Sequence, residues 1–541
     1  MLAAGALAVS CADYNVTDDF TAQPDPTFTE PYKDYAPVKS YIDRANYPNL
    51  SLGATLKVVD FNKQELAHSA AVTNFDNVTF GTSLMSGTIV NEKGVMNFLD
   101  MNDLLEHVQE IDAEVFGSPI VANANQADSW LKTLTAPIEI QVDPVEDKEV
   151  DYTKMEEFTG TAKSGKPRIE KNYDGEDNAL RIPKMAKVYI VEGFDVDPLG
   201  DYTITFYAQV DKDETVICTF SDNKIQDGGN DKKFSIKAGK WVKVVVETKP
   251  APDAKEGYLM LEGNFNSVVY IQKVSVVHNP DNHRPQTAQE INDTINYALD
   301  AWCDGLMKIN EGRIKSFDLI DEAIDTKAEM ENGLYDLKHS TDNIFWQDIF
   351  GSENYAPTVS KVASAAFEKH GGNPADLRFF ISESGLDDTK KMESLNYWIK
   401  TWDAHGAKID GINAKLNLSY SEDQPTQEAY MAKLNTLLDN LAATGKLIRI
   451  SNFDIKYQDA TGAYVTAEKI SLDQRQKLAD YYAYVIKSYM NKIPHDKQAG
   501  ICKGNLADTT DPVGLWSIDK NSKDWVRTAT YKAFCDALSG K

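Results

Sequence analysis

The sequence predicts an α/β protein in which a β/α domain is interrupted by an all-β sandwich. Candidate strands and amphipathic helices alternate in the first and last parts of the chain. Between about residues 135 and 280, short β-rich runs are separated by turns, and no long amphipathic helix is evident. The two β/α parts together hold about 360 residues, which is enough for a (β/α)8 barrel with long loops. We therefore expect a barrel carrying an inserted, jelly-roll-like sandwich.

Composition limits the classes of partner. The chain has 541 residues, of which 42% are hydrophobic and 26% charged, as in ordinary globular proteins. Its net charge of −27 repels phosphate backbones, so nucleic acid is not an expected partner, whereas neutral polysaccharides are unaffected. The five cysteines form no CxxC pair and the eight histidines no HxxxH or HExxH spacing. No metal or other cofactor is therefore expected.

The N-terminus has the features of an export signal. Residues 1–11 are too short to span a bilayer and place small apolar residues before Cys11. The run 7–11, LAVSC, resembles a bacterial lipobox, which implies lipidation of Cys11; the alternative is a short apolar terminus with a chance cysteine. Asp13, Asp18 and Asp19 resemble the surface-export signal of Bacteroidota lipoproteins. We expect a protein lipid-anchored to the outer membrane at the cell surface, with residues 12–36 as a proline-containing tether.

The first β/α part is expected over residues 37–133. Strand-like runs occur at 52–56 and 78–80, a helical stretch at 100–108, and an apolar strand at 119–122. Strands that alternate with helices in this way are typical of βαβ units with a parallel sheet.

The sandwich is expected over residues 134–281. Its β-rich runs cover 187–191, 203–207, 241–246 and 268–277, and the 227–231 segment is a turn rather than a calcium loop. Aromatic faces can hold neutral glycans, but most aromatic residues belong to cores. Strand alternation has two phases, so the sequence does not assign either role to any of the candidates Tyr173, Tyr189, Phe206, Tyr207, Trp241, Tyr258, Phe265 and Tyr270.

The second β/α part is expected over residues 282–541. Thr287 and Glu290 form a capping-box pattern at a helix start. Apolar stripes at helical spacing follow, and such stripes are core faces. The expected strands lie at 317–320, 378–381, 409–418 and 447–455.

Several segments of this β/α portion resemble a known family. The run 316–324, SFDLIDEAI, resembles the WDVVNEAI strand of family 10 glycoside hydrolases, the xylanase family. Segments 344–351, 409–412 and 116–131 resemble further motifs of that family in the same order. Some members carry a carbohydrate-binding sandwich after the third barrel strand, where this chain breaks. The resemblance implies a TIM barrel interrupted after its third strand.

The resemblance also places the reacting residues. Retaining glycosidases use two carboxyl groups about 5 Å apart. Glu322 matches the general acid/base, whereas the nucleophile motif ITELD aligns with 450–454, ISNFD, and puts Asn452 at the nucleophile position. An amide has no charge to stabilise an oxocarbenium ion and forms no stable glycosyl ester. Asp454 lies two strand residues away, about 6.6 Å, which is too far to replace it.

Sugar-contacting positions differ from the family at five strand ends. The substituted positions hold Gly81, Thr82, Met85, Ser118, Ala122, Asn123, Lys415, Asn417 and Lys503. Glu383 also aligns with an acidic family residue. The residues that remain as candidates for carbohydrate contact are Asn123, Trp130, Asn417 and Trp516. Such widespread change indicates that the cleavage subsite is not used for hydrolysis.

The leading hypothesis is a non-catalytic, surface-anchored lipoprotein that captures a β-linked plant polysaccharide for an outer-membrane glycan uptake complex. Xylan is the first candidate by resemblance. One alternative is an active glycoside hydrolase of altered mechanism, with Glu322 as acid and a water or another carboxylate as its partner. Another is a structural subunit without a sugar site, which predicts a large apolar patch on the barrel exterior. Glu322 itself would then be vestigial, ligand-contacting or bonded to a neighbouring amide or arginine.

Overall fold

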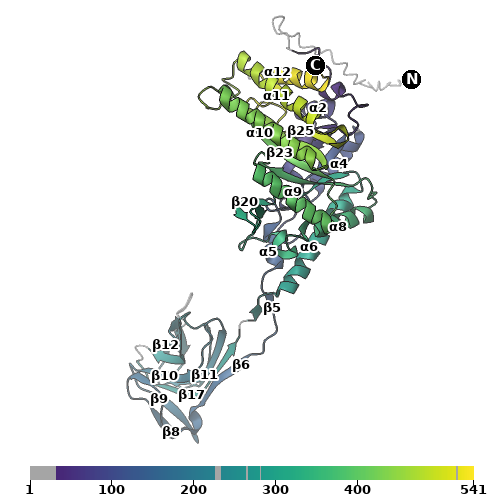
Figure 1. Cartoon of the computed structure of the whole chain (residues 1–541). Coiled ribbons are helices and arrows are strands. Elements are labelled where there is room, and N and C mark those ends of the chain that lie inside the picture. Colours follow the sequence, from purple (N-terminus) through teal and green to yellow (C-terminus); the bar gives the residue numbers. More distant parts are fainter. Residues whose placement is uncertain are drawn as a thin grey trace, which may run out of the picture. The chain divides into compact units, whose positions relative to one another are not determined.

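The computed structural model describes residues 32–111, 113–225, 233–262, 266–280, 282–519 and 522–540. The chain forms two compact units, Ala136–Thr287 and the remainder, Met1–Thr135 with Ala288–Lys541 (Figure 1). The limits of the insert predicted from the sequence are residues 134 and 281. Cys11, most of the tether, the 227–231 turn and Phe265 lie outside the described residues, so those expectations stay predictions.

The larger unit is a closed parallel barrel. Within the described residues, eight strands follow one another around it in chain order, and β25 pairs with β1 to close it. The strands are β1 (Ser51–Thr55), β2 (Asn77–Thr79), β3 (Glu114–Gly117), β19 (Ser316–Asp321), β22 (Arg378–Ser384), β23 (Gly411–Ser421), β24 (Leu447–Gln458) and β25 (Gln498–Lys503). The predicted TIM barrel is confirmed.

The third strand of the barrel is divided into two short segments. Both β3 and the short β4 (Val121–Ala122) pair with β19, the first at its start and the second at its end. The chain then passes through α5 (Asp128–Leu134), leaves for the second unit, and returns in α6 (Ala288–Asn310) before β19. The β-rich unit is therefore inserted after the third barrel strand, as expected.

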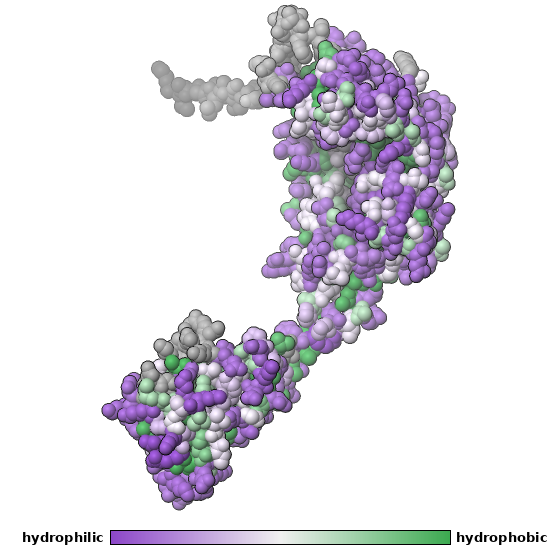
Figure 2. All heavy atoms as spheres, turned by 60° about the vertical axis from the view of Figure 1, so that its left-hand side comes forward, coloured by the Kyte–Doolittle hydropathy of each residue, from purple (hydrophilic) through white to green (hydrophobic). Residues whose placement is uncertain are grey.

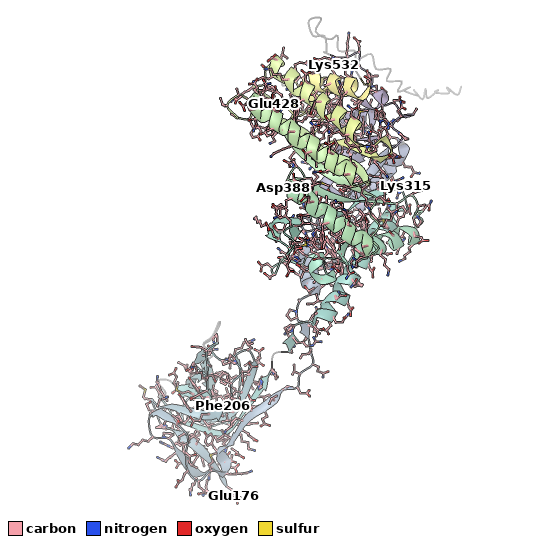
Figure 3. All side chains as sticks on the ribbon, in the orientation of Figure 1. Glu176, Phe206, Lys315, Asp388, Glu428 and Lys532 are labelled. Atoms are coloured by element: carbon pink, nitrogen blue, oxygen red, sulfur yellow. The ribbon has the colours of Figure 1, made fainter. Side chains whose placement is uncertain are left out.

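Helices surround the barrel and pack apolar stripes against it. On α6, the side chains of Ile295, Leu299 and Trp302 are buried, as the spacing predicted. The Asp388 side chain caps α9 by accepting from the backbone N–H groups of Lys390 and Lys391 (Figure 3). The other helices of this unit are α1 (Val58–Asn62), α2 (Leu66–Asn74), α3 (Ser86–Ile89), α4 (Leu99–Glu110), α7 (Trp346–Phe350), α8 (Tyr355–Lys369), α9 (Thr389–Ala404), α10 (Gln424–Ala443), α11 (Leu472–Lys492) and α12 (Ala529–Leu538).

The smaller unit is all-β. Its described residues form two six-stranded antiparallel sheets: β13-β12-β16-β10-β7 with β14 on β12, and β15-β11-β17-β9-β8 with β6 on β17. Alternate side chains of both sheets form one core that includes Phe206 (Figure 3). The strands are β6 (Val145–Asp151), β7 (Ala162–Ser164), β8 (Arg168–Asp174), β9 (Asp177–Ile182), β10 (Lys187–Phe194), β11 (Asp201–Val210), β12 (Glu214–Phe220), β13 (Asn223–Ile225), β14 (Lys233–Ile236), β15 (Val242–Thr248), β16 (Gly257–Glu262) and β17 (Val269–Asn279).

Short two-stranded ribbons complete the fold. Beside the chain's passage into and out of the insert, β5 (Ile138–Glu139) pairs with β18 (His283–Arg284). In the barrel unit, β20 (Ile324–Glu329) pairs with β21 (Tyr335–Leu337), and β26 (Trp516–Ile518) with β27 (Trp525–Arg527).

On the face drawn in Figure 2, hydrophilic side chains cover most of each unit and hydrophobic ones are scattered among them. None of the helices in the described segments combines the length and the apolar character that a membrane crossing needs.

Candidate functional site

The carboxyl ends of the barrel strands enclose a polar cavity of about 200 Å³. In barrels of this type, this end is where loops and strand termini build active sites. The residues that line it include Thr55, Thr79, Gly81, Thr82, Met85, Ser118, Asp318, Asp321, Asn413, Lys415, Arg449, Ser451 and Asn452. Many positions that differ from the family pattern therefore meet in one place.

Glu322 lies directly after β19 in an unusual backbone conformation. Its φ of +53° falls in the left-handed region, which costs a non-glycine residue of the order of 1 kcal/mol. Two hydrogen bonds hold this conformation: the Glu322 N–H donates to the Ser382 carbonyl at 2.9 Å, and the Lys338 ammonium donates to the Glu322 carbonyl at 2.5 Å. The backbone at the expected acid/base position is thus fixed by its surroundings.

Lysines and carboxylates alternate around Glu322. The Lys415 ammonium on β23 contacts the carboxylate of Asp321 and lies 3.4 Å from Oε1 of Glu322. On α9, the Lys391 ammonium lies 3.7 Å from Oε2 of Glu322 and 2.8 Å from Oε2 of Glu383. These five side chains, which we call the lysine–carboxylate chain, run from Asp321 through Lys415, Glu322 and Lys391 to Glu383.

The lysine–carboxylate chain sets the protonation state of Glu322. Burial alone would raise the pKa of Glu322, but Lys415, the Ser384 hydroxyl, Lys391 and Lys338 together outweigh it and hold that pKa below its usual value. A glycosidase general acid needs the opposite, a raised pKa that keeps its proton near neutral pH. Glu322 is consequently expected to be negatively charged near neutral pH.

Two other carboxyl groups have raised pKa values. Burial raises the pKa of Glu383 to about 7 despite its pair with Lys391. Burial likewise raises the pKa of Asp318 to about 7, with Arg449 acting against the rise and Asp321 adding to it. Asp318 accepts from the Asn413 amide at 3.1 and 3.0 Å, and the Asn413 oxygen accepts from Nη1 of Arg449 at 3.2 Å. Both acids are committed to internal partners.

The nucleophile position carries an amide. Asn452 lies on β24, is exposed and lines the cavity, with a φ of +49°. Asp454, two residues further on, forms an ion pair with the buried ammonium of Lys503 and accepts from the backbone N–H and side-chain amide of Asn505 at 3.1 and 2.6 Å. The structure therefore brings Asn452 to the cavity and occupies Asp454 elsewhere.

The predicted carbohydrate contacts divide into two groups. Asn417 is exposed on β23, and Asn123, just after β4, has both side-chain amide atoms buried and without a hydrogen-bond partner. Trp130 and Trp516 are each only 6% exposed and belong to the barrel core, with Trp516 packed on Trp525 and Tyr531. Both tryptophans are packed in the barrel core in this structure, and their assignment to sugar contact stays a prediction.

The sandwich has an aromatic cluster separate from its core. Tyr173 and Tyr270 stack with ring centroids 3.8 Å apart, and Trp241 meets Tyr173 edge-on at 6.1 Å. The Trp241 indole N–H donates to Asp174 at 2.8 Å, which fixes its ring. These residues lie on the outer side of the β15-β11-β17-β9-β8 sheet, because Val269 and Ile271, which flank Tyr270, point into the core. Phe206, by contrast, is a core residue.

In the described part of the chain, no group of three or more His, Cys, Asp or Glu side chains is placed so that it could hold a metal ion. The four described cysteines, Cys218, Cys303, Cys502 and Cys535, are buried and unpaired.

The sequence indicated Glu322, Glu383 and Lys415 of the lysine–carboxylate chain, but not Lys391 or the nearby Lys338. Lys391 comes from α9 and Lys338 from the segment after β21, so neither belongs to a barrel-strand motif. For Lys415 the signal was that the family places a neutral glutamine there. The structure adds that this substitution neutralises two carboxylates.

Comparisons with known proteins support the assignment of the barrel fold. Residues 276–522 match the sequence profile of glycosyl hydrolase family 10. No curated protein matches the chain. Among solved structures, xylanase B from Clostridium stercorarium F9 aligns over 93% of this chain and 100% of its own, with 11% identity and a TM-score of 0.52.

Two further structures give the same result. Xylanase 10C from Cellvibrio japonicus aligns over 95% of this chain and 75% of its own, with 14% identity and a TM-score of 0.52. XynB from Paenibacillus barcinonensis aligns over 93% and 99%, with 8% identity and a TM-score of 0.52. At such identities the likeness is one of fold. The profile match over residues 276–522 and the likeness to xylanase structures thus agree on a barrel of the glycosyl hydrolase family 10 type.

Proposed function

We propose that this protein is a non-catalytic polysaccharide-binding protein built on a glycosidase barrel. The observation that carries the proposal is the lysine–carboxylate chain around Glu322, of which Asp321 and Lys415 line the cavity that holds Asn452 at the nucleophile position. A retaining mechanism needs a proton donor and a carboxylate nucleophile. Here the first is held deprotonated and the second is an amide, so both steps lack their reagent.

The ligand class follows from the fold's relatives and from the sandwich. The three xylanases named above act on xylan by their names, which makes a β-linked plant polysaccharide, xylan first, the proposed ligand. Tyr173 and Trp241 are half-buried and provide aromatic faces of the kind that pack against the C–H faces of sugars, and the buried Tyr270 supports the Tyr173 ring by stacking on it. Gln272 follows Tyr270 by two residues on β17, and its buried Nε2 has no hydrogen-bond partner. It supplies an unpaired donor on the same side of the sheet.

The cellular setting is proposed from the sequence. LAVSC with its lipidated Cys11 would anchor the protein at the outer face of the outer membrane, and residues 12–36 would tether it. In that position, captured polymer would be presented to an outer-membrane uptake complex. Metabolic labelling with a palmitate analogue tests this part, because it should label the wild type and not Cys11→Ala.

The binding proposal is tested by titration calorimetry and reducing-end assays on the same mixtures of protein with xylan, mixed-linkage β-glucan and a neutral α-glucan. We expect binding of a β-glycan without release of reducing ends. Trp241→Ala should weaken binding about tenfold or more, about 1.4 kcal/mol, the loss expected for a central aromatic contact. Tyr189→Ala is the matched control, since Tyr189 stacks on Tyr258 in the other sheet.

Two results would contradict the proposal. Release of reducing ends that Glu322→Gln abolishes would establish an active hydrolase of altered mechanism. Absence of binding to every β-glycan, in both calorimetry and affinity gels, would favour the structural-subunit hypothesis. Equal loss in the Trp241 and Tyr189 variants would move the binding site away from the Tyr173 cluster.

A further inference from the structure

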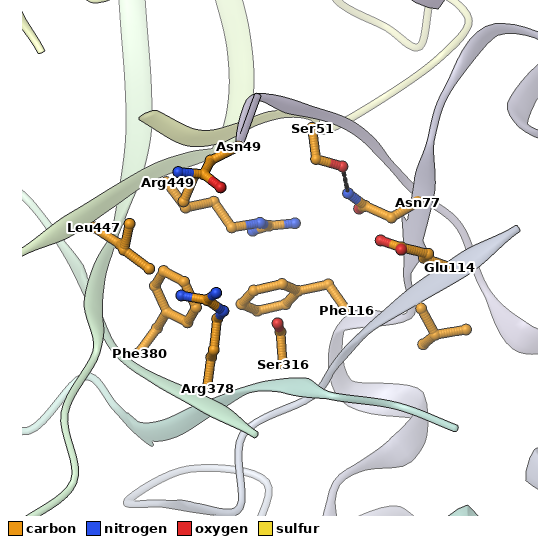
Figure 4. Close-up of a pocket in the computed structure, with 12 residues that line it drawn as sticks. Asn49, Ser51, Asn77, Glu114, Phe116, Ser316, Arg378, Phe380, Leu447 and Arg449 are labelled. Carbon is orange, nitrogen blue, oxygen red and sulfur yellow. Dashed lines mark hydrogen bonds between the residues drawn. The ribbon is translucent and has the colours of Figure 1, made fainter. Parts of the chain in front are cut away.

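The amino end of the barrel contains a second cavity, of about 160 Å³ (Figure 4). Its wall is built from the first residues of several strands, including Ser51, Asn77, Glu114, Ser316 and Arg378. Side chains two residues along a strand point the same way, so Phe116, Phe380 and Arg449, each third in its strand, form the next layer inward. The family resemblance gives no role to this end of the barrel.

Arg449 is an incompletely paired buried cation. It is 4% exposed, and its guanidinium lies 4.0 Å from the ring centre of Phe116. Nη1 donates to Asn413, whereas Nη2 is buried and has no hydrogen-bond partner. An arginine cannot lose its proton, and a buried donor left unpaired is costly. Figure 4 shows its guanidinium pointing into the cavity.

Arg378 adds a second cation at the mouth. Among the described residues, no carboxylate lies within 4 Å of its guanidinium, and its side chain makes no hydrogen bond. Its basic neighbours are different: Arg44 pairs with Asp76 at 2.8 Å and Lys315 with Asp376 at 3.3 Å. The two guanidinium groups of the cavity therefore remain available to an anion.

Acceptors occupy the other side. Glu114 is on β3, four strands from β24 in the eight-stranded ring, and is therefore opposite Arg449; Figure 4 shows its carboxylate across the cavity. Next to it, the Asn77 amide donates to the Ser51 hydroxyl at 2.6 Å and leaves its buried oxygen unpaired. Glu114, Arg378 and Arg449 are the charged side chains among the described residues that line the cavity, giving it a net charge of +1.

We propose that this cavity binds a sugar acid of one pyranose ring, such as a hexuronate. The carboxylate would bond Arg378 and Arg449, the hydroxyl groups would donate to Glu114 and Asn77, and a C–H face would pack on Phe116. A cavity of about 150 Å³ holds one benzene ring, so the larger sugar acid would place its ring in the cavity and extend its outward substituents through the mouth. A plain phosphate would leave the acceptor side unpaired and facing a negative charge. The inference does not rest on the proposed polysaccharide binding.

Titration calorimetry of the full chain with glucuronate, glucose and inorganic phosphate tests the proposal. We expect 1:1 binding of glucuronate at least tenfold tighter than binding of either other probe. Arg378→Ala should weaken glucuronate at least tenfold, the loss expected for a charge-assisted pair. Arg313→Ala is the matched control, because Arg313 is a nearby cation outside this cavity.

A second variant separates the sugar acid from a simple anion. Glu114→Gln should strengthen phosphate, since it removes a repelling charge, and weaken glucuronate, since it replaces a charged acceptor of the sugar hydroxyl groups by a neutral amide. Phosphate that binds as tightly as glucuronate to the wild type would replace the proposal with a plain anion site. Absence of glucuronate binding up to millimolar concentration, or binding unaffected by Arg378→Ala, would overturn it. Because Arg378 is at the mouth and exposed, its loss should leave the fold intact.

Discussion

The two ends of the barrel carry similar side chains in opposite electrostatic states. At the carboxyl end, Lys415 and Lys391 alternate with three carboxylates, and each charge has a partner. Toward the amino end, Arg449, which lines both cavities, is only partly paired, and Arg378 has no charged partner among the described residues. The comparison teaches that charged residues at a strand end do not by themselves make a reactive site. Their availability to a ligand depends on what already neutralises them.

The largest expected effect is at the carboxyl end. Lys391→Met should lower the free energy of unfolding by about 3–5 kcal/mol at pH 8, because it leaves the fully buried Glu383 carboxylate without its cation. The loss should be smaller at pH 5, where Glu383 is protonated, since its pKa is about 7 even with Lys391 present. Urea unfolding of the barrel at the two pH values measures this.

The matched control is Lys390→Ala. Lys390 pairs with the exposed Glu329 at 2.5 Å, and surface pairs contribute about 1 kcal/mol or less. A loss equal to that of Lys391→Met would show that the charges of the carboxyl end are not specially coupled, and the contrast between the two ends would fail.

Asp318→Asn is expected to have the opposite sign. The pKa of Asp318 is raised to about 7 in the fold, so the wild type loses stability as pH rises from about 4 to 7. The variant has no such proton to lose and should be more stable than the wild type at pH 8 by about 2–4 kcal/mol, with no difference below pH 4. Urea unfolding across this range checks the slope. A variant less stable than the wild type at pH 8 would mean that the Asp318 charge is needed beside Arg449.

Glu322→Gln should show a smaller effect with the reverse pH dependence. The surrounding lysines hold the pKa of Glu322 below its usual value, so its charge stabilises the fold above about pH 4.5 and this contribution is lost in acid. We expect the variant to lose about 1 kcal/mol at pH 7 and to match the wild type near pH 3. Thermal unfolding at both pH values is sufficient. A gain in stability at pH 7 would indicate an acid whose proton is retained, contrary to the non-catalytic proposal.

The smallest effect is expected for Arg378→Ala at the amino end. An exposed charge without partners contributes little, so the free energy of unfolding should change by about 0.5 kcal/mol or less. Urea unfolding without added ligand measures it. A loss above about 2 kcal/mol would show that Arg378 has a structural partner, and the two ends would then be alike.

The barrel could be predicted because its signals are local. Apolar residues recur with the period of a strand in runs such as 409–412 and with the period of a helix in stripes such as Leu395, Trp398 and Trp402. In the structure these apolar faces are buried. The motif around Glu322 and the substitution at Asn452 were likewise visible, because each lies within a single strand.

The state of the site could not be predicted, because it depends on residues brought together by the fold. Lys391 reaches Glu322 and Glu383 from a helix, and no spacing along the chain shows that. Burial of Trp130 and Trp516 depends on which side of their elements the core covers. Arg449 left a faint signal, a lone arginine in the apolar run LIRI, but its unpaired Nη2 is visible only in three dimensions.

The position of the inserted unit has a consequence for biosynthesis. Residues 136–287 emerge from the ribosome after the first three barrel strands and before the fourth strand, β19. Both β3 and β4 pair with β19, so their edges stay unpaired until it is synthesised. At about 5–20 residues per second, translation of this insert occupies roughly 8–30 s. The sandwich can fold within that time, whereas the first three barrel strands still lack their pairing partners. Nascent chains stalled at about residue 330, where the ribosome exit tunnel has released the insert but still holds β19, should therefore contain a protease-resistant sandwich beside a protease-sensitive first β/α segment.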